Sequence, residues 1–87
     1  MSKDYQSMVP ERVFGTIIIL NPQGNRIVTH CGKIISDTLG AWILALLAPA
    51  SEHWYAKCQE PGFLNNTEVQ TWEETDRELR IVVQLKA

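Results

Sequence analysis

The sequence predicts a single α+β domain in which two strands, a helical region and two further strands follow one another. Three observations predict this order: a turn signature at 21–25 between two apolar runs, an apolar stretch at 39–48, and alternating apolar and polar side chains near the end of the chain. A length of 87 residues fits one domain over 1–87. Residues 1–10 are expected to be a flexible or short helical N-terminal segment.

The first two strands are predicted at 11–20 and 26–31. Residues 11–20 carry β-branched and large apolar side chains on both faces, which is typical of an interior strand covered on each side. Pro22 suits the first central position of a turn because its φ is fixed, and Gly24 suits the left-handed position that follows. Gly32 is expected to end the returning strand.

The apolar stretch at 39–48 is predicted to be the main helix. Ser36 is the expected N-cap, because its hydroxyl can accept a hydrogen bond from an unpaired amide at the start of a helix. Asp37 is expected in the first turn, where its charge complements the helix dipole. Pro49 is expected to stop the helix.

The rest of the chain is predicted to form a short second helix and a hairpin. Ser51 is the expected N-cap of that helix. The last strand is the clearest one, since apolar and polar side chains alternate along it. The expected bounds are 51–59 for the helix, 63–66 for a loop, 67–73 and 78–86 for the strands, and 74–77 for the turn between them.

Composition and charge exclude several classes of protein. The chain is 45% hydrophobic, which is too apolar for a disordered segment. A net charge of −2 and an isoelectric point near 5.6 argue against nucleic-acid binding. No apolar run reaches the roughly 20 residues that span a bilayer, and the N-terminus does not match a signal peptide. We therefore expect an intracellular protein with no membrane anchor of its own.

The sequence offers little chemistry for catalysis or metal binding. His30, Cys31, His53 and Cys58 are possible zinc ligands, but their spacing does not bring two ligands together on one short turn. No nucleophile has an orienting partner, and no glycine-rich phosphate loop is present. We expect no catalytic residue, no metal and no cofactor, and we expect both cysteines to be free thiols in a reducing compartment.

The helix predicted at 39–48 has no polar stripe. Large apolar side chains with helical spacing form one face, and the opposite face is small but still apolar. An apolar patch of this kind on a small domain marks an interface, so we expect the second face to contact another chain. The predicted partner interface comprises Leu39, Gly40, Ala41, Trp42, Ile43, Leu44, Leu46 and Leu47 of the helix, with Val69 and Thr71 of the strand at 67–73.

Two glycine-containing patterns resemble the roadblock (dynein light-chain) family. The first hairpin of that family is similar to Val13-Phe14-Gly15-x-Ile17-x-Ile19-x-Asn21-x-x-Gly24-x-x-Ile27. The join from hairpin to helix in the small Ragulator and EGO-complex subunits, which are short members of the superfamily, is similar to Gly32-x-x-x-Ser36-Asp37-x-x-Gly40-x-x-Ile43. The late strands also fit, so the resemblance spans 13–85. It implies structural roles for Gly15, Gly24, Ser36, Asp37 and Gly40.

This resemblance implies a roadblock-like fold, with an antiparallel sheet of four or five strands and the main helix on one face. It implies a non-enzymatic scaffold that forms a heterodimer with another roadblock-type chain through the central helix and an adjacent edge strand. In Ragulator-like complexes, a lipidated subunit wraps such heterodimers on the lysosome or vacuole, where they hold Rag-type GTPases for amino-acid signalling to the TOR kinase complex. The implied location is the cytoplasmic face of the lysosome, vacuole or late endosome, with membrane contact only through the lipidated partner.

The acidic hairpin at 73–78 favours an alternative function. A cluster of carboxylates at a turn would suit a small inhibitor or immunity-type protein that binds a basic target. Such binding would be sensitive to salt. A small ligand-binding or enzymatic domain is a further alternative, but the sequence offers no convergent set of polar side chains for it.

Overall fold

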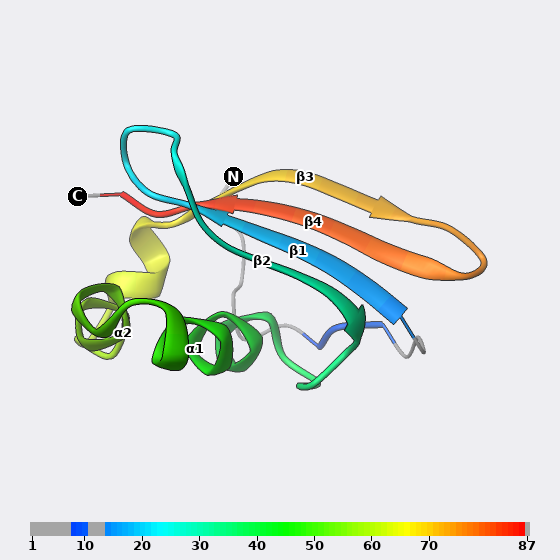
Figure 1. The fold of residues 1–87 in the computed structure, drawn as a ribbon, viewed down its shortest axis with the longest axis horizontal. Coiled ribbons are helices and arrows are strands. Elements are labelled where there is room, and N and C mark those ends of the chain that lie inside the picture. Colours follow the sequence, from blue (N-terminus) through cyan, green and yellow to red (C-terminus); the bar gives the residue numbers. More distant parts are fainter. Residues whose placement is uncertain (1–7, 11–13, 87) are drawn as a thin grey trace.

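The computed structural model describes residues 8–10 and 14–86. The α+β class and the predicted order of strands and helices are confirmed (Figure 1). Residues 1–7 of the N-terminal segment expected at 1–10 lie outside the described residues. The same holds for residues 11–13 of the strand expected at 11–20. The elements are β1 (Phe14–Leu20), β2 (Arg26–Lys33), α1 (Leu39–Ala50), α2 (Glu52–Cys58), the 3-10 helix η1 (Phe63–Asn66), β3 (Glu68–Glu74) and β4 (Glu78–Gln84).

The described strands form one mixed sheet with the order β2-β1-β4-β3. Two antiparallel hairpins flank a central pair, β1 and β4, that is parallel. The expectation of an antiparallel sheet is therefore wrong at its centre. The reason is the helical crossover: α1 is about 18 Å long, which is close to the length of a strand, and it returns the chain to the other end of the sheet before β3 begins. As a result, β4 runs in the direction of β1.

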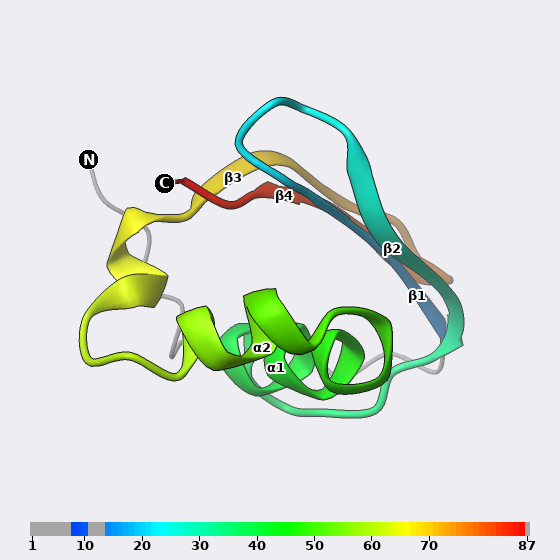
Figure 2. The ribbon, with the colours of Figure 1, turned by 60° about the vertical axis from the view of Figure 1, so that its left-hand side comes forward.

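Both helices lie on the same face of the sheet (Figure 2). Ile17 and Ile19 of β1 point toward them and are fully buried, as is Trp42 of α1. The opposite side of the sheet has no covering element among the described residues, and Phe14 on that side is 55% exposed. We call this side the open face. Among the described residues, α1 and α2 pack together on one side, so this chain covers only one of the two faces of the first strand that are expected to be covered.

Two glycines of the first hairpin have distinct structural roles. A Cβ atom at Gly15 would lie only 2.7 Å from Cη2 of Trp42 and 2.9 Å from Cγ1 of Ile34, so only glycine lets the Trp42 ring pack directly on β1. Gly24 has a φ of +85°, in the left-handed region that the turn requires. The Asn21 side chain supports the same turn by accepting hydrogen bonds from the backbone amides of residues 23 and 25.

The start of α1 differs from the prediction. The N-cap is Thr38, whose hydroxyl accepts a hydrogen bond from the Ala41 amide at 3.3 Å, so the expectation for Ser36 is wrong. Asp37 lies before the helix instead of in its first turn. Its backbone carbonyl accepts a hydrogen bond from the Val9 amide at 2.7 Å, which ties the N-terminal segment to the start of α1.

Two residues that are predicted to end an element lie inside it in the structure. Pro49 lies inside α1, which runs to Ala50; in the last turn a proline removes only one intrahelical hydrogen bond, so the helix ends soon after it and not before. Gly32 lies within β2, which continues to Lys33. The N-cap of α2 is Ser51, as predicted, with its hydroxyl accepting from the Trp54 amide at 3.2 Å.

Candidate functional site

Most of the helix residues predicted to contact a partner are used within the chain. Their large side chains pack beneath the sheet, where Trp42, Ile43 and Leu47 are fully buried. On the outer side of α1, Ala41 is exposed and Leu44 is half-buried. The predicted residues that the structure buries are Leu39, Gly40, Trp42, Ile43, Leu46 and Leu47.

The predicted strand residues Val69 and Thr71 lie on opposite faces of β3. Val69 pairs with Val83, on the helix side, whereas Thr71 pairs with Val82, on the open face. A shift of register between them accounts for this, because it inserts an extra residue at Gln70. Val69, Thr71 and α1 therefore do not form one continuous surface.

The open face has an uncharged centre. Side chains that pair directly across strands share a face, so Thr29, Ile18, Val82 and Thr71 form one row across all four strands. Ile18 and Val82 at the middle of the row are half-buried by their neighbours alone. The signal for this surface is present in the sequence as the apolar outer side of the first strand, which is expected to be covered on each side. The open face comprises Phe14, Thr16, Ile18, Leu20, Arg26, Thr29, Cys31, Lys33, Glu68, Thr71, Glu73, Glu78, Arg80, Val82 and Gln84.

Charged side chains lie at the margins of the open face on the side of β3 and β4. Arg80 forms an ion pair with Glu78 at 2.8 Å, and Lys86 forms one with Glu68 at 2.9 Å. Exposed pairs of this kind add little stability, but they neutralise charge around the apolar centre. The arrangement of an apolar centre within a polar rim is that of a protein interface.

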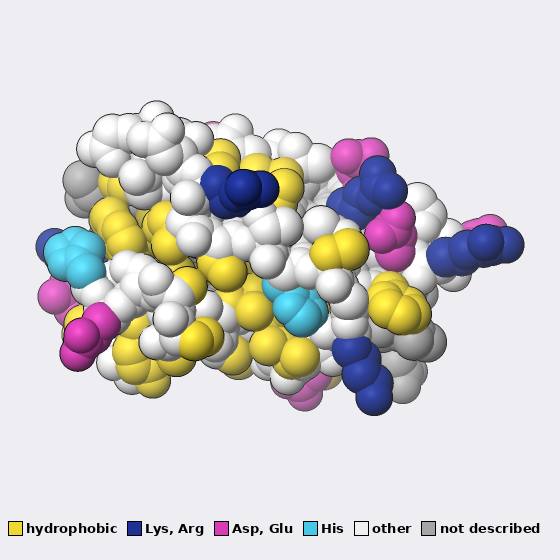
Figure 3. Space-filling model, viewed as in Figure 1, with side chains coloured by type: hydrophobic (Ala, Val, Ile, Leu, Met, Phe, Trp, Pro, Cys, Tyr) yellow, Lys and Arg dark blue, Asp and Glu magenta, His cyan; other side chains and the backbone are white. Residues whose placement is uncertain are grey.

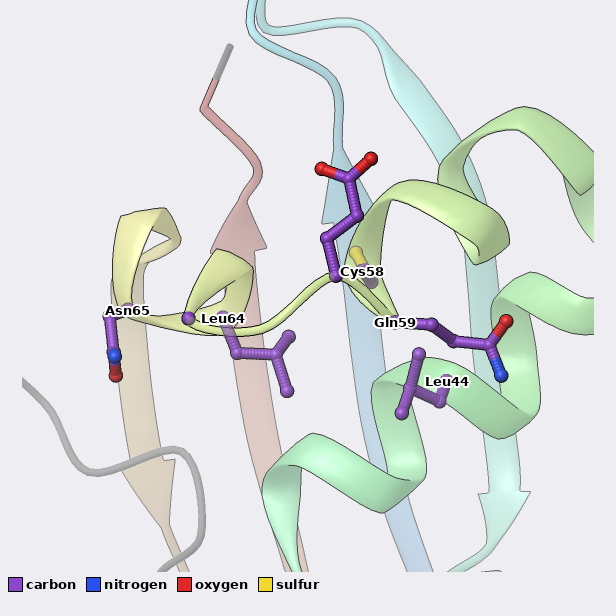
Figure 4. A pocket seen from close by; sticks show the side chains of 7 residues that line it. Leu44, Cys58, Gln59, Leu64 and Asn65 are labelled. Atoms are coloured by element: carbon purple, nitrogen blue, oxygen red, sulfur yellow. The ribbon is translucent and has the colours of Figure 1, made fainter.

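A cavity of about 490 Å³ lies between α1 and the segment that joins α2 to η1. The side chains of Leu44 and Leu64 face each other across it, and Cys58 forms part of its wall (Figure 4). Burial raises the pKa of the Cys58 thiol to about 11, which disfavours the reactive thiolate. The cavity brings together no pair of groups suited to acid–base or nucleophilic chemistry. Its lining is Leu44, Cys58, Gln59, Glu60, Gly62, Leu64 and Asn65.

Metal binding finds no support in the described residues. Among them, no group of three or more His, Cys, Asp or Glu side chains could hold an ion. Of the four candidate ligands named from the sequence, His30 contacts the Trp42 ring edge-on, with ring centroids 6.0 Å apart, and His53 contacts Trp54 in the same manner at 5.0 Å. Cys31 is exposed on the open face, and its sulfur accepts a hydrogen bond from Thr16 at 3.5 Å.

Some carboxylates of the acidic hairpin contact side chains of the hairpin itself. Glu73 lies directly across from Arg80, and Arg80 is paired with Glu78. Glu74 accepts a hydrogen bond from the indole of Trp72 at 2.9 Å. The cation of Arg80 thus offsets part of the negative charge at this hairpin.

No protein-family model, no curated protein and no solved structure matches this chain. None of the helices in the described part of the chain is long and apolar enough to cross a membrane. The fold and the surfaces described above therefore carry the functional proposal.

Proposed function

We propose that this chain is a non-enzymatic adaptor subunit whose open face packs against a layer supplied by another protein chain. The observation that carries this proposal is the composition of β1, which has no charged residue and is apolar on both sides, although the helices of the described residues cover only one side. Strands of this composition are normally buried on both faces. Full burial of a large apolar side chain is worth roughly 2 kcal/mol, so covering Phe14, Ile18 and Val82 would favour association.

The narrower proposal is a heterodimer with another roadblock-like subunit, within a complex that holds Rag-type GTPases on the lysosomal or vacuolar membrane for TOR signalling. It rests on the resemblance of the hairpin and helix-start patterns. The α+β order and the helices gathered on one face agree with it. The parallel pairing of β1 and β4 departs from the antiparallel sheet that the resemblance implies. On α1, a partner would meet Ala41 and Leu44, since the larger side chains are buried.

Co-purification with matched variants tests the proposal. The tagged chain would be expressed in its native cells, and the proteins that purify with it identified. We expect one stoichiometric partner with the wild type and with Gln23→Lys, which lies in the exposed hairpin turn, and loss of that partner with Ile18→Lys. Thermal unfolding monitored by circular dichroism would establish that Ile18→Lys is folded.

The possible results separate the general proposal from the narrower one. Retention of the partner by a folded Ile18→Lys variant would show that the open face is not the contact. A roadblock-like partner would support the narrower proposal, and a partner of another fold would leave only the adaptor role. Light scattering on the isolated wild-type chain adds a check: a stable monomer with a cooperative melt would argue against an obligate interface.

A further inference from the structure

The two edges of the sheet carry opposite charge. Within the described residues, β2 pairs only with β1 and β3 only with β4, so each edge has backbone amide and carbonyl groups that no strand occupies. Strand β2 contains Arg26 and Lys33 and no carboxylate. Strand β3 contains three glutamates and no basic residue. The chain thus offers one basic and one acidic edge.

The acidic edge is protected against a further strand. Glu68 is paired with Lys86, Glu74 accepts a hydrogen bond from Trp72, and Glu73 lies across from Arg80. The bulge at Gln70 also interrupts the regular ladder near the middle of β3. Bulges and charged side chains are the features that natural sheets use to prevent pairing at an edge.

The basic edge is less protected, because its bulge at Ile27 lies near one end and its charged residues lie only at the two ends. In the part of the chain that the structure describes, neither Arg26 nor Lys33 has an ion-pair partner. Their cross-strand partners are Leu20 and Phe14, so both basic side chains lie on the side of the open face. The only shift of register in β2 is at its first residues, and the stretch 28–31 that follows is regular and uncharged.

Apolar side chains continue from the β2 edge to the helices. Figure 3 shows hydrophobic groups along the seam between the sheet and the helix layer. Ile27 and Val28 of β2 and Trp54 and Tyr55 of α2 are only partly buried against the core. At the far end of the edge, the imidazole of His30 lies 2.7 Å from the Lys33 carbonyl oxygen, which satisfies that acceptor within the chain. An added strand would therefore pair along 28–31.

We propose that β2 is the edge at which a partner strand extends this sheet, and that the partner strand is acidic. It carries a carboxylate near each end, about 20 Å apart to match Arg26 and Lys33, with β-branched residues between them. A second copy of β2 would place like charges against Arg26 and Lys33. On β3, Glu68 is already paired with Lys86 and Glu74 already accepts a hydrogen bond from Trp72. The occupant is thus a different chain. Arg26 and Lys33 lie on the side of the open face, but the backbone edge of β2 is distinct from the apolar centre of that face at Ile18 and Val82, so either proposal can fail alone.

A peptide binding experiment tests the charge of the partner strand. The probe is a synthetic peptide of about ten residues, long enough to cover β2, in which threonine alternates with valine and glutamates stand at both ends. We expect saturable shifts of the backbone amide resonances of 28–31 and slower hydrogen exchange there. The same peptide with terminal lysines should bind at least about fivefold more weakly, because both end charges then repel.

Charge reversal on the protein provides the matched control. The double variant Arg26→Glu with Lys33→Glu should prefer the lysine-ended peptide, whereas Lys57→Glu on the exposed side of α2 should keep the wild-type preference. Ile18→Lys should also keep it, since that side chain belongs to the open face. Equal binding of the two peptides, resonance shifts at β3, or absence of binding would each overturn the proposal. Loss of binding only in Ile18→Lys would place the peptide on the open face instead.

Discussion

The covered face and the open face of the sheet are built from adjacent residues of the same strands but differ in how deeply their side chains are buried. On the covered face, Ile17, Ile19 and Leu79 are fully buried against the helices, and Gly15 is constrained by the Trp42 ring. On the open face, Thr16, Ile18 and Val82 are only half-buried. The comparison indicates that one face stabilises the isolated chain, whereas the other is available for association.

The largest expected difference between the faces is at the neighbouring isoleucines of β1. Ile17→Ala should lower the free energy of unfolding by about 3 kcal/mol, because it leaves a cavity in a fully buried site. Ile18→Ala should lower it by about 1 kcal/mol or less, since that side chain is already partly in water. Urea unfolding of the isolated chain measures both values. Equal losses would mean that the open face is covered in solution.

A smaller effect is expected from adding one methyl group to β1. Gly15→Ala should lower the free energy of unfolding by about 2 kcal/mol, because its Cβ would clash with Trp42 and Ile34. Adding Trp42→Phe should recover part of the loss, since the smaller ring relieves the clash and the Trp42 indole N–H has no hydrogen-bond partner among the described residues. Thr16→Val on the open face is the control and should be nearly neutral. If Gly15→Ala were also neutral, close packing of Trp42 on β1 would be refuted.

The two cysteines give the smallest expected effect. Burial raises the pKa of Cys58 from 9.0 to about 11, so iodoacetamide should modify the exposed Cys31 first, and modification of Cys58 should accelerate as the pH approaches 11. Because the folded state holds this proton more tightly, the stability that it contributes is lost as the pH rises from 9 to 11. The loss should be on the order of 1 kcal/mol and absent in Cys58→Ala. Mass spectrometry and urea unfolding at several pH values measure these effects, and equal modification rates would contradict burial of Cys58.

The sequence predicts much of the local structure. The turn at 21–25, the alternating pattern of the last strand and the cap at Ser51 were predicted correctly, because each depends on residues within a few positions of one another. The N-cap of α1 was misplaced because Ser36 and Thr38 are both suitable capping residues. The helix begins after Thr38, next to the hydrogen bond that the backbone amide of Val9, distant in sequence, donates to the Asp37 carbonyl.

The candidate site was less predictable than the fold. The sequence shows that α1 and β1 each have more apolar surface than one contact requires. It does not show which apolar side remains uncovered. In the structure the large residues of α1 pack in the core, and the apolar side chains left uncovered by this chain's helices are on β1 and β4. That choice depends on where Trp42 fits, and the glycine that accommodates it is 27 positions earlier in the chain.

Local interactions in the sequence thus determine the elements, their order and the conformation of the first turn. The direction of β4, the face that the helices cover and the edges that remain free depend on the tertiary structure. The physical reason is that these features arise from contacts between segments far apart in the chain: the length of α1 sets the end of the sheet at which β3 begins, and the packing of Trp42 against Gly15 sets the covered face. The opposite charges of Arg26 and Lys33 on one edge and of the β3 glutamates on the other become significant only once this topology separates them.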